Sequence, residues 1–210
     1  MAKVAVIGAG TAGLASAIRL QSLGYDVDIY EKNPKVGGRM YQINDRGFSF
    51  DVGPTIVMMP ELYKEVFEVS GVDASKYIDM KPLNPMNRVY FPDGTKFDIS
   101  SDLTKLISQL ESFGDEDAIG YMQYLSDVYE RYLRAKKHFL YKSYRRASEF
   151  YNIKTLIQLL KLRTLNNAYQ SISSFVKDEK LRQALSFQTL YIGTSPYSGP
   201  VILFVFTFTN

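Results

Sequence analysis

The chain of 210 residues contains no cysteine and no tryptophan, and His138 is its one histidine. Without cysteine it has no disulfide framework, no thiolate nucleophile and no cysteine-based metal site. A single histidine excludes a zinc or iron centre held by several imidazoles, so we expect no metal, and we expect His138 to lie on the surface of a basic helix. No apolar run reaches the length of about 18 residues that a spanning helix needs. The chain starts in a strand-like run without a charged-then-apolar leader, so we expect a cytoplasmic protein.

Charge is distributed unevenly along the chain, although the net charge is only +3. Residues 129–163, the basic segment, hold ten Lys or Arg and two Glu, whereas the other 175 residues hold fifteen basic and twenty acidic side chains. This asymmetry indicates that the basic segment has a surface role of its own.

The first thirty-one residues contain a strand, a glycine-rich turn, a helix and a second strand. The apolar run 3–7 is typical of a buried parallel strand, and it leads into Gly8-Ala9-Gly10-Thr11-Ala12-Gly13, a complete GxGxxG. A helical pattern follows and stops at Gly24, and a β-rich run over 26–30 ends at Glu31. The order predicts a dinucleotide-binding unit and not merely a structural turn, because each part stands in its place.

Each part of this motif has a physical role in holding a dinucleotide. Gly8 permits the tight turn, Gly10 lets the backbone approach a pyrophosphate, and Gly13 lets the helix pack closely on the sheet. The amides of Thr11, Ala12 and Gly13 lie at a helix N-terminus, where an anion is favoured. Glu31 follows Gly13 by eighteen residues and accepts hydrogen bonds from ribose hydroxyls. A carboxylate there repels a 2′-phosphate, which argues against NADP.

A second phosphate-directed feature follows the ribose acid. After Lys32 and Asn33 come Gly37-Gly38-Arg39-Met40, in which the glycines allow close backbone approach and Arg39 offers a forked cation to phosphate oxygens. The alternative is a turn with a surface arginine, and the preceding nucleotide unit favours the phosphate interpretation.

Beyond residue 40 the pattern changes from α/β to mostly helical. An alternating run at 48–52 is broken by Gly53-Pro54-Thr55, and Pro60 begins a helix that stops at Gly71. Residues 88–99 read as a hairpin around Pro92-Asp93-Gly94. The remaining helix starts are predicted at Ser101, Gly114, Asn152 or Thr155, Thr164, and Asp178.

These motifs together resemble the FAD-dependent carotenoid desaturases, which are related to the flavin amine oxidases. The resemblance rests on the glycine turn, on Glu31-Lys32-Asn33, on Gly37-Gly38-Arg39, and on the segment 50–55. Segments 53–60, 150–152, 162–166 and 187–193 resemble more narrowly the bacterial dehydrosqualene (diapophytoene) desaturases. The resemblance covers about Lys3 to Pro200.

The resemblance implies an α/β fold and a bound cofactor. It implies a Rossmann-like FAD-binding module over 1–59 and a mainly helical region over 60–200 that faces substrate or membrane, followed by an aberrant apolar tail over 201–210. FAD would be held without a covalent bond by the two glycine segments and Glu31, with Gly53, Pro54 and Thr55 near the flavin ring. The implied reaction is desaturation of a thirty-carbon carotenoid precursor to diaponeurosporene-type polyenes.

Three hypotheses about the activity of the chain remain. Members of the family are more than twice as long as this chain. The resemblance therefore implies that the chain is the N-terminal part of such a protein, and whether this part is active by itself is a separate question. The alternatives are a flavin oxidoreductase of the amine oxidase or protoporphyrinogen oxidase type, and a non-catalytic fragment. Asp51, Glu149 and Lys154 are candidate acid–base groups, but no spacing distinguishes them, so the catalytic residues are unknown.

Tyrosines alternate with cations in the basic segment, which suits the headgroup layer of an anionic membrane. We expect a peripheral contact with the inner face of the cell membrane, where a polyisoprenoid substrate dissolves, and no nucleic-acid partner. The alternatives are a solvated helical face and RNA stacked on tyrosines. The side chains concerned are Tyr129, Tyr132, Tyr141, Tyr144, Tyr151, Arg131, Arg134, Lys136, Lys137, Lys142, Arg145 and Arg146.

Overall fold

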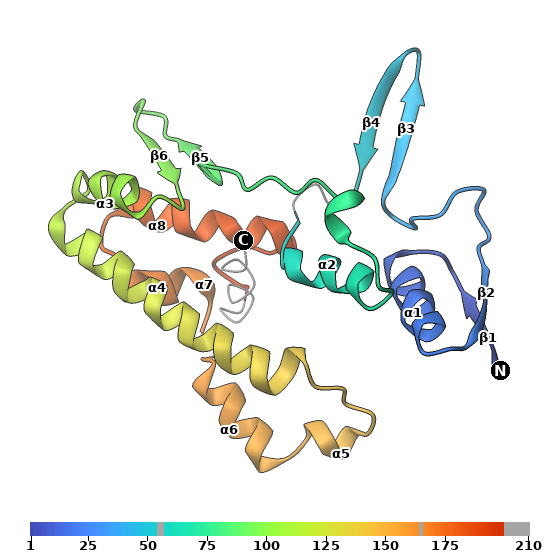
Figure 1. The fold of residues 1–210 in the computed structure, drawn as a ribbon. Helices are drawn as coiled ribbons and strands as arrows, with labels where there is room; N and C mark the ends of the chain where they lie inside the picture. The colour runs from blue at the N-terminus through green and yellow to red at the C-terminus, as the bar shows by residue number, and fades with distance from the viewer. Residues whose placement is uncertain (54–56, 164–165, 200–210) are drawn as a thin grey trace. The chain divides into compact units, whose positions relative to one another are not determined.

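The structure is a computed structural model that describes residues 1–53, 57–163 and 166–199 (Figure 1). The predicted helix start at Thr164, the site residues Pro54 and Thr55, and the tail 201–210 lie outside the described residues. The chain divides into two compact units, which we call the first unit (residues 1–81) and the second unit (from residue 82).

The first unit opens with the predicted strand–helix–strand arrangement. Strand β1 (Lys3–Ile7) pairs in parallel with β2 (Asp26–Tyr30), with Lys3 opposite Asp26 and Ile7 opposite Tyr30. Helix α1 (Thr11–Ser22) connects them as the apolar periodicity predicts. In the described part of the chain β1 pairs with β2 alone, so Ile7 is 83% exposed and the expectation of a buried strand is wrong for it.

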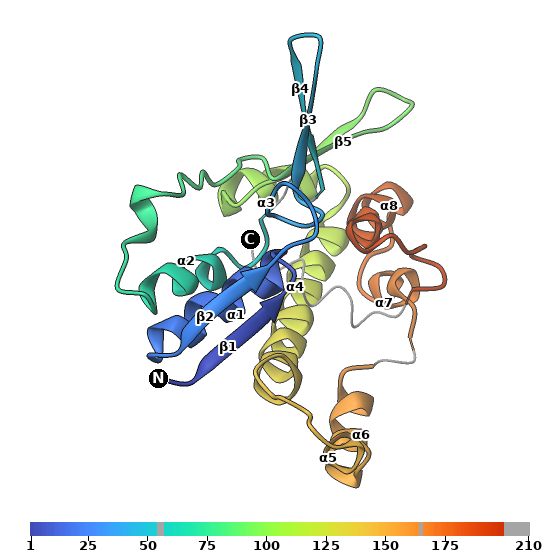
Figure 2. The ribbon, with the colours of Figure 1, turned by 90° about the vertical axis from the view of Figure 1, so that its right-hand side faces the viewer.

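The first unit also contains a hairpin, of which the sequence pattern predicts one strand. Strand β4 (Phe48–Val52) was expected, but its antiparallel partner β3 (Tyr41–Asp45) was not. The turn between them places Arg46 at φ 47° and Gly47 at φ 83°. Two adjacent residues with positive φ are typical of a tight hairpin turn, which a glycine at the second position makes possible. The hairpin extends away from the parallel strands in both ribbon views (Figures 1 and 2).

Helix α2 (Pro60–Glu68) begins at the predicted proline and is followed by a short 3₁₀ helix, η1 (Ala74–Lys76). Arg19 of α1 donates to Glu65 of α2 at 2.9 Å, so the two helices pack side by side. Helix α2 was expected to open the helical region over 60–200, whereas in the structure it packs within the first unit. The functional boundary near residue 59 stays a prediction.

The second unit consists of a hairpin and helices, in the order that the sequence predicted. Its elements are β5 (Asn87–Tyr90), β6 (Lys96–Ile99), α3 (Leu103–Glu111), α4 (Asp115–Ala135), the π-helix η2 (Lys136–Leu140), α5 (Ala147–Phe150), α6 (Ile153–Lys161), α7 (Ala168–Ser173), α8 (Glu179–Ser186) and the 3₁₀ helix η3 (Phe187–Ile192).

Several helices of the second unit start at a residue whose side chain caps them. Asn152 and Asp178 cap α6 and α8 as predicted, because their side chains accept hydrogen bonds from Thr155 and Leu181 amides. The expected cap at Ser101 is wrong by one residue. Asp102 caps α3 instead, and its Oδ1 accepts from the amides of Thr104 and Lys105 at 3.1 and 3.2 Å. A carboxylate is also favoured there by the helix dipole.

The core of the second unit lies between the hairpin and helices α3, α4, α7 and α8. The fully buried side chains that fill it include Phe97, Leu110, Tyr124, Ile172 and Leu181. Gly120 lets α4 approach the backbone after α7 closely, because a Cβ at this position would lie 1.9 Å from the Phe175 carbonyl oxygen. The position of α4 therefore depends on side-chain packing in the core and on this close backbone approach at Gly120.

Candidate functional site

The turn between β1 and α1 is held by backbone contacts. The Gly8 amide donates to the Tyr30 carbonyl at 2.7 Å, which joins the end of β1 to the end of β2. A Cβ on Gly13 would lie 1.9 Å from the Gly8 carbonyl oxygen, so only glycine lets the first turn of α1 approach the strand this closely. The roles predicted for these two glycines therefore match the geometry.

Glu31 follows β2 and its carboxylate turns toward this glycine turn. Oε2 accepts a hydrogen bond from the Ala9 amide at 2.7 Å, and Oε1 accepts from the Asn33 amide and from Asn33 Nδ2 at 2.8 and 2.9 Å. The Ala9 amide is the main reason that the pKa of Glu31 is lowered, and the Asn33 amide is the next. The carboxylate is thus oriented and kept ionised beside the turn.

The second glycine segment lies directly against the first. The Gly37 amide donates to the Ala9 carbonyl at 2.8 Å, and a Cβ on Gly38 would lie 3.0 Å from the Gly10 Cα. Met40 closes the loop, because its amide donates to the Gly37 carbonyl at 3.1 Å. The two glycine segments therefore meet backbone to backbone, and any side chain at Gly38 would separate them.

A third segment, at the end of β4, reaches the same place. Gly53 has φ 112°, and a Cβ there would lie 2.7 Å from the Arg39 carbonyl oxygen. The structure therefore brings the turn 8–13, Glu31, residues 37–40 and Gly53 together within the first unit. Lys32 and Arg39 are exposed beside them. The predicted site residues form one cluster, as far as they lie among the described residues.

The cluster includes the N-terminal end of α1. Helix α1 has no side-chain cap at Gly10 and no acidic residue in its first turn. The amides of Thr11, Ala12 and Gly13 therefore point their partial positive charge outward without a competing carboxylate. An uncapped helix end beside a fixed carboxylate can hold a diphosphate and a sugar at the same time.

Asn33 was absent from the predicted site residues. It holds Glu31 by a backbone and a side-chain hydrogen bond, so it positions the carboxylate. The available signal was its spacing, because a carboxylate commonly accepts hydrogen bonds from the residue two positions along the chain.

The basic segment divides into buried and exposed parts. Arg131 lies on the inward side of α4, where its side chain is 4% exposed, pairs with Asp127 and donates to Ser171 Oγ at 3.3 Å. Tyr132 is buried as well. The expectation that these two face a membrane is therefore wrong, because helical periodicity turns Arg131 toward α7 and Tyr132 toward Leu162. Tyr129, Tyr141 and Tyr151 are exposed.

The three candidate acid–base groups do not form a cluster. Asp51 accepts from Gln42 Nε2 at 3.0 Å on the β3–β4 hairpin, and Glu149 accepts from the Arg145 amide at 3.0 Å. Lys154 is an exposed residue of α6. The structure assigns a catalytic role to none of them.

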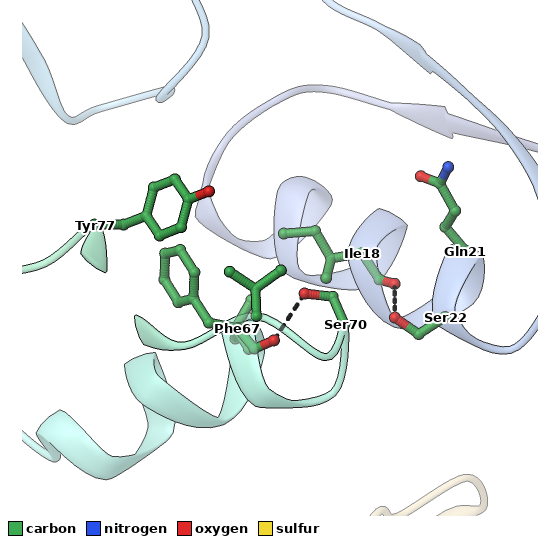
Figure 3. A pocket seen from close by; sticks show the side chains of 8 residues that line it. Ile18, Gln21, Ser22, Phe67, Ser70 and Tyr77 are labelled. Atoms are coloured by element: carbon green, nitrogen blue, oxygen red, sulfur yellow. Dashed lines mark hydrogen bonds between the residues drawn. The ribbon is translucent and has the colours of Figure 1, made fainter. Parts of the chain in front are cut away.

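A hollow of about 510 Å³ lies between the C-terminal halves of α1 and α2 (Figure 3). Ile18, Phe67 and Tyr77 provide apolar walls, and the ring of Tyr77 stacks on Phe67 with 5.7 Å between centroids. The Ser22 hydroxyl donates to the Ile18 carbonyl of α1, and the Ser70 hydroxyl donates to the Phe67 carbonyl of α2. None of the predicted site residues lines this hollow, so it is separate from the glycine cluster.

No helix in residues 1–53, 57–163 and 166–199 has both the length and the apolar character needed to cross a bilayer. No group of three or more metal-ligating side chains was found in the same ranges.

Comparison with known proteins agrees with this geometry. Residues 6–70 match the model of the NAD(P)-binding Rossmann-like domain family. The chain is structurally similar to putrescine oxidase, with a TM-score of 0.55 and 18% identity over 97% of this chain and 40% of that chain. It is also similar to an oxidoreductase from Methanosarcina mazei, with a TM-score of 0.54 and 22% identity over 97% and 42%. These structures support the fold, and they confirm the prediction of a Rossmann-like α/β architecture.

Proteins found by sequence share a much higher identity with this chain than the two structures do. The 4,4′-diapophytoene desaturase (4,4′-diaponeurosporene-forming) of Staphylococcus haemolyticus is 52% identical over 199 residues, which are 95% of this chain and 40% of that protein. The protein of the same name from Staphylococcus aureus strain Newman is 47% identical over 198 residues, or 94% and 39%. The chain is therefore a relative of the 4,4′-diapophytoene desaturases and spans about two fifths of their length.

Proposed function

We propose that the first unit binds FAD and supplies the nucleotide site of a desaturase acting on 4,4′-diapophytoene. The observation that carries this proposal is the contact of the Glu31 carboxylate with the Ala9 amide, 2.7 Å apart, beside an uncapped helix N-terminus. The relatives' names state the reaction, and because the chain spans two fifths of their length, the reaction is proposed for the longer protein.

The remaining hydrogen-bonding capacity of Glu31 fits a ribose. A carboxylate has about four lone-pair positions. Oε1 uses two for Asn33, whereas Oε2 uses one for Ala9. Oε2 is thus the oxygen that has room for a ribose hydroxyl, and the Ala9 contact holds it at the turn. Ionisation of this group also disfavours a 2′-phosphate, which supports FAD over NADP.

The backbone cradle fits a diphosphate. A Cβ on Gly38 would lie only 3.0 Å from the Gly10 Cα, so the two glycine segments face each other with their main chains, and we infer that main-chain amides line this region. The exposed guanidinium of Arg39 supplies charge to the phosphate oxygens. We assign cofactor contacts to Gly8, Ala9, Gly10, Thr11, Ala12, Gly13, Glu31, Lys32, Gly37, Gly38, Arg39, Met40, Gly53, Pro54 and Thr55.

Bound FAD would supply the acceptor for the hydride that leaves the substrate. The residues of the first unit bind and orient this cofactor. The hydrogen bonds from Ala9 and Asn33 keep Glu31 in its orientation before the cofactor arrives, which lowers the entropy cost of binding. Gly53 lies against Arg39, and we place its loop near the ring system, because β4 leads the chain from the hairpin back to the glycine cluster.

The substrate is a thirty-carbon polyisoprenoid that dissolves in bilayers, so we propose a peripheral contact with the inner face of the cell membrane. The support is the exposed part of the basic segment, which includes Lys142, Arg145, Arg146 and Tyr151. Each basic residue near an anionic surface contributes about 1 kcal/mol.

The test of the cofactor proposal is an FAD titration of the purified full chain, followed by the visible flavin absorbance. Substitution Glu31→Gln removes the charge and keeps the size, and we expect an affinity lower by roughly tenfold or more, because charge-assisted hydrogen bonds contribute about 1.5–3 kcal/mol. Asp28→Asn is the matched control, since Asp28 is an acid of β2, the strand that Glu31 follows, and pairs with Lys3. Equal affinities of E31Q and the unsubstituted chain would contradict the proposal.

A non-catalytic nucleotide-binding fragment is the second candidate, and the 40% coverage of the relatives favours it. The test is pigment formation in cells that make the precursor. The chain is expressed alone and together with the part of the relatives that it does not cover. Pigment from the chain alone would refute the fragment, whereas pigment only from the combination would support it.

A further inference from the structure

Helix α6 has an inner side that is attached to α4 and an outer side opposite it. Leu162, which follows the helix, is fully buried and packs with Tyr132 and Ala135 of α4. Thr155 is 7% exposed on the same side, and Gln158 Oε1 accepts from Arg134 of α4 at 3.4 Å. This inner side attaches the helix to the second unit and accounts for its position.

The other face of α6 is aliphatic and exposed. It consists of four side chains with exposed fractions of 69, 51, 43 and 56%, and we call it the outer α6 face: Ile153, Leu156, Ile157 and Leu160. Their spacing of i, i+3, i+4 and i+7 places them on one stripe of the helix. Attachment to α4 uses the opposite side, so intrahelical and core packing give no reason for these four residues to be aliphatic.

The surroundings of the outer α6 face are basic and aromatic. Residues 141–163 hold six Lys or Arg and one acid, Glu149. Lys154 and Lys161 are exposed on α6 itself, and Tyr151 is 80% exposed directly before the helix. Both ribbon views show α5 and α6 together beside the C-terminal end of α4, so these cations belong to the same part of the second unit (Figures 1 and 2).

We propose that the outer α6 face inserts into the boundary between headgroups and acyl chains of an anionic phospholipid bilayer. Exposed aliphatic side chains on one stripe, flanked by lysines with long stems and by tyrosine, are typical of helices that lie in the membrane interface. The positive charge selects an anionic lipid surface over an apolar protein groove, which would need acids at its rim to match these cations.

The inference rests on the proposed function in one respect, the need to collect a bilayer-dissolved substrate. It goes further because it names the inserting element. The cations attract the helix to the surface. The four aliphatic side chains then leave water, and the transfer of each lowers the free energy by an amount of the order expected for a buried aliphatic residue. Attachment of α6 to α4 then holds the second unit at the membrane.

The chain has no tryptophan, so one introduced indole reports on a single position. We would compare Leu156→Trp with Ile119→Trp, an exposed aliphatic position of α4 in the same unit. Both proteins, as full chains, are mixed with vesicles of phosphatidylglycerol or of phosphatidylcholine at low salt. We expect a blue shift and quenching by brominated acyl chains for L156W with phosphatidylglycerol, and neither for I119W. Equal responses, or none for L156W, would overturn the inference.

A second experiment measures the loss of vesicle binding when the outer α6 face is made polar. The double change Leu156→Glu with Leu160→Glu is expected to lower co-sedimentation with phosphatidylglycerol vesicles by at least roughly tenfold, because two aliphatic groups no longer leave water. Ile119→Glu should leave co-sedimentation unchanged. Far-UV circular dichroism shows whether each variant keeps its helices. If the double variant loses its helices, the comparison of L156W with I119W decides whether the outer α6 face inserts. Capture of the outer α6 face by a protein, with no vesicle response, would overturn the proposal.

FAD titration of the same variants separates this inference from the proposed function. Lost vesicle binding with intact FAD binding supports the inserting face. Vesicle binding that survives L156E/L160E with intact FAD binding overturns the inference and leaves the cofactor proposal standing. Vesicle insertion by L156W in a chain that binds no FAD overturns only the cofactor proposal.

Discussion

The two units of the chain are held in their conformations by different interactions. Among the described residues, the buried apolar side chains of the first unit are three alanines, Ala9, Ala17 and Ala74, whereas the second unit contains seventeen. Ile7, Ile29 and Tyr30 of the small parallel sheet are exposed. The second unit is stabilised mainly by apolar burial, which is the dominant favourable term in folding.

The site geometry of the first unit depends instead on backbone contacts. Gly8, Gly37 and Ala9 exchange main-chain hydrogen bonds with their neighbours, and Gly13, Gly38 and Gly53 lie where a Cβ would collide with another backbone atom. A binding cradle for phosphates must expose its amides, so it cannot be covered by side chains. The comparison teaches that the cofactor end of this chain is specified by the absence of side chains and the helical end by their packing.

The largest expected effect is on the core of the second unit. Leu110→Ala truncates a fully buried side chain, and we expect a loss of about 3 kcal/mol in the free energy of unfolding from lost burial and the remaining cavity. Leu23→Ala, at a position 75% exposed in the first unit, should change it by about 0.5 kcal/mol or less. Urea unfolding measures both. Similar losses would show that the two units do not differ in packing as described.

A pair of glycine substitutions sharpens the comparison, because each creates the same collision in a different unit. A Cβ at Gly13 and a Cβ at Gly120 both lie 1.9 Å from a backbone carbonyl oxygen. We expect Gly120→Ala to cost about 1–3 kcal/mol of stability through overpacking and to leave FAD affinity unchanged. Gly13→Ala should lower FAD affinity by roughly tenfold or more, since displacement of the α1 amides misplaces the diphosphate.

Urea unfolding and FAD titration of both variants provide the measurement. Ser16→Ala, an exposed position of α1, is the control and should affect neither quantity. The comparison would fail if Gly120→Ala lowered FAD affinity as much as Gly13→Ala did.

The smallest effect is a pH dependence at Glu31. Its pKa lies below the ordinary 4.5 in the folded chain, chiefly because of the Ala9 amide. A lowered folded pKa means that the charged group stabilises the fold fully above 4.5 and loses this contribution as the pH falls through the folded value. The stability difference between the unsubstituted chain and Glu31→Gln should be constant from about pH 8 to 5 and shrink below 4.5. A difference that grows on acidification would contradict the assignment.

The local elements of both units followed from the sequence to a large extent. Gly8 and Gly13 with Glu31 predicted the βαβ unit, and the NAD(P)-binding Rossmann-like model over 6–70 confirms it. Capping residues such as Asn152 and Asp178 marked helix starts. Their side chains accept a hydrogen bond from the backbone amide three residues later, so the signal is local in the sequence. Strand β3 was missed because its alternation is weak and its turn has a positive φ at Arg46, a residue that rarely adopts it.

The composition and spacing of the chain alone determined its dinucleotide motif, its basic segment and the kinds of its elements, because these depend on interactions between residues near in sequence. Only the tertiary structure decided which cations are buried and which are free to meet a partner, as Arg131 and Lys154 show. It also placed Gly53 against Arg39 and the Glu31 carboxylate on the Ala9 amide. Such contacts join residues distant in the chain, and their geometry depends on packing and hydrogen bonding that no local pattern records.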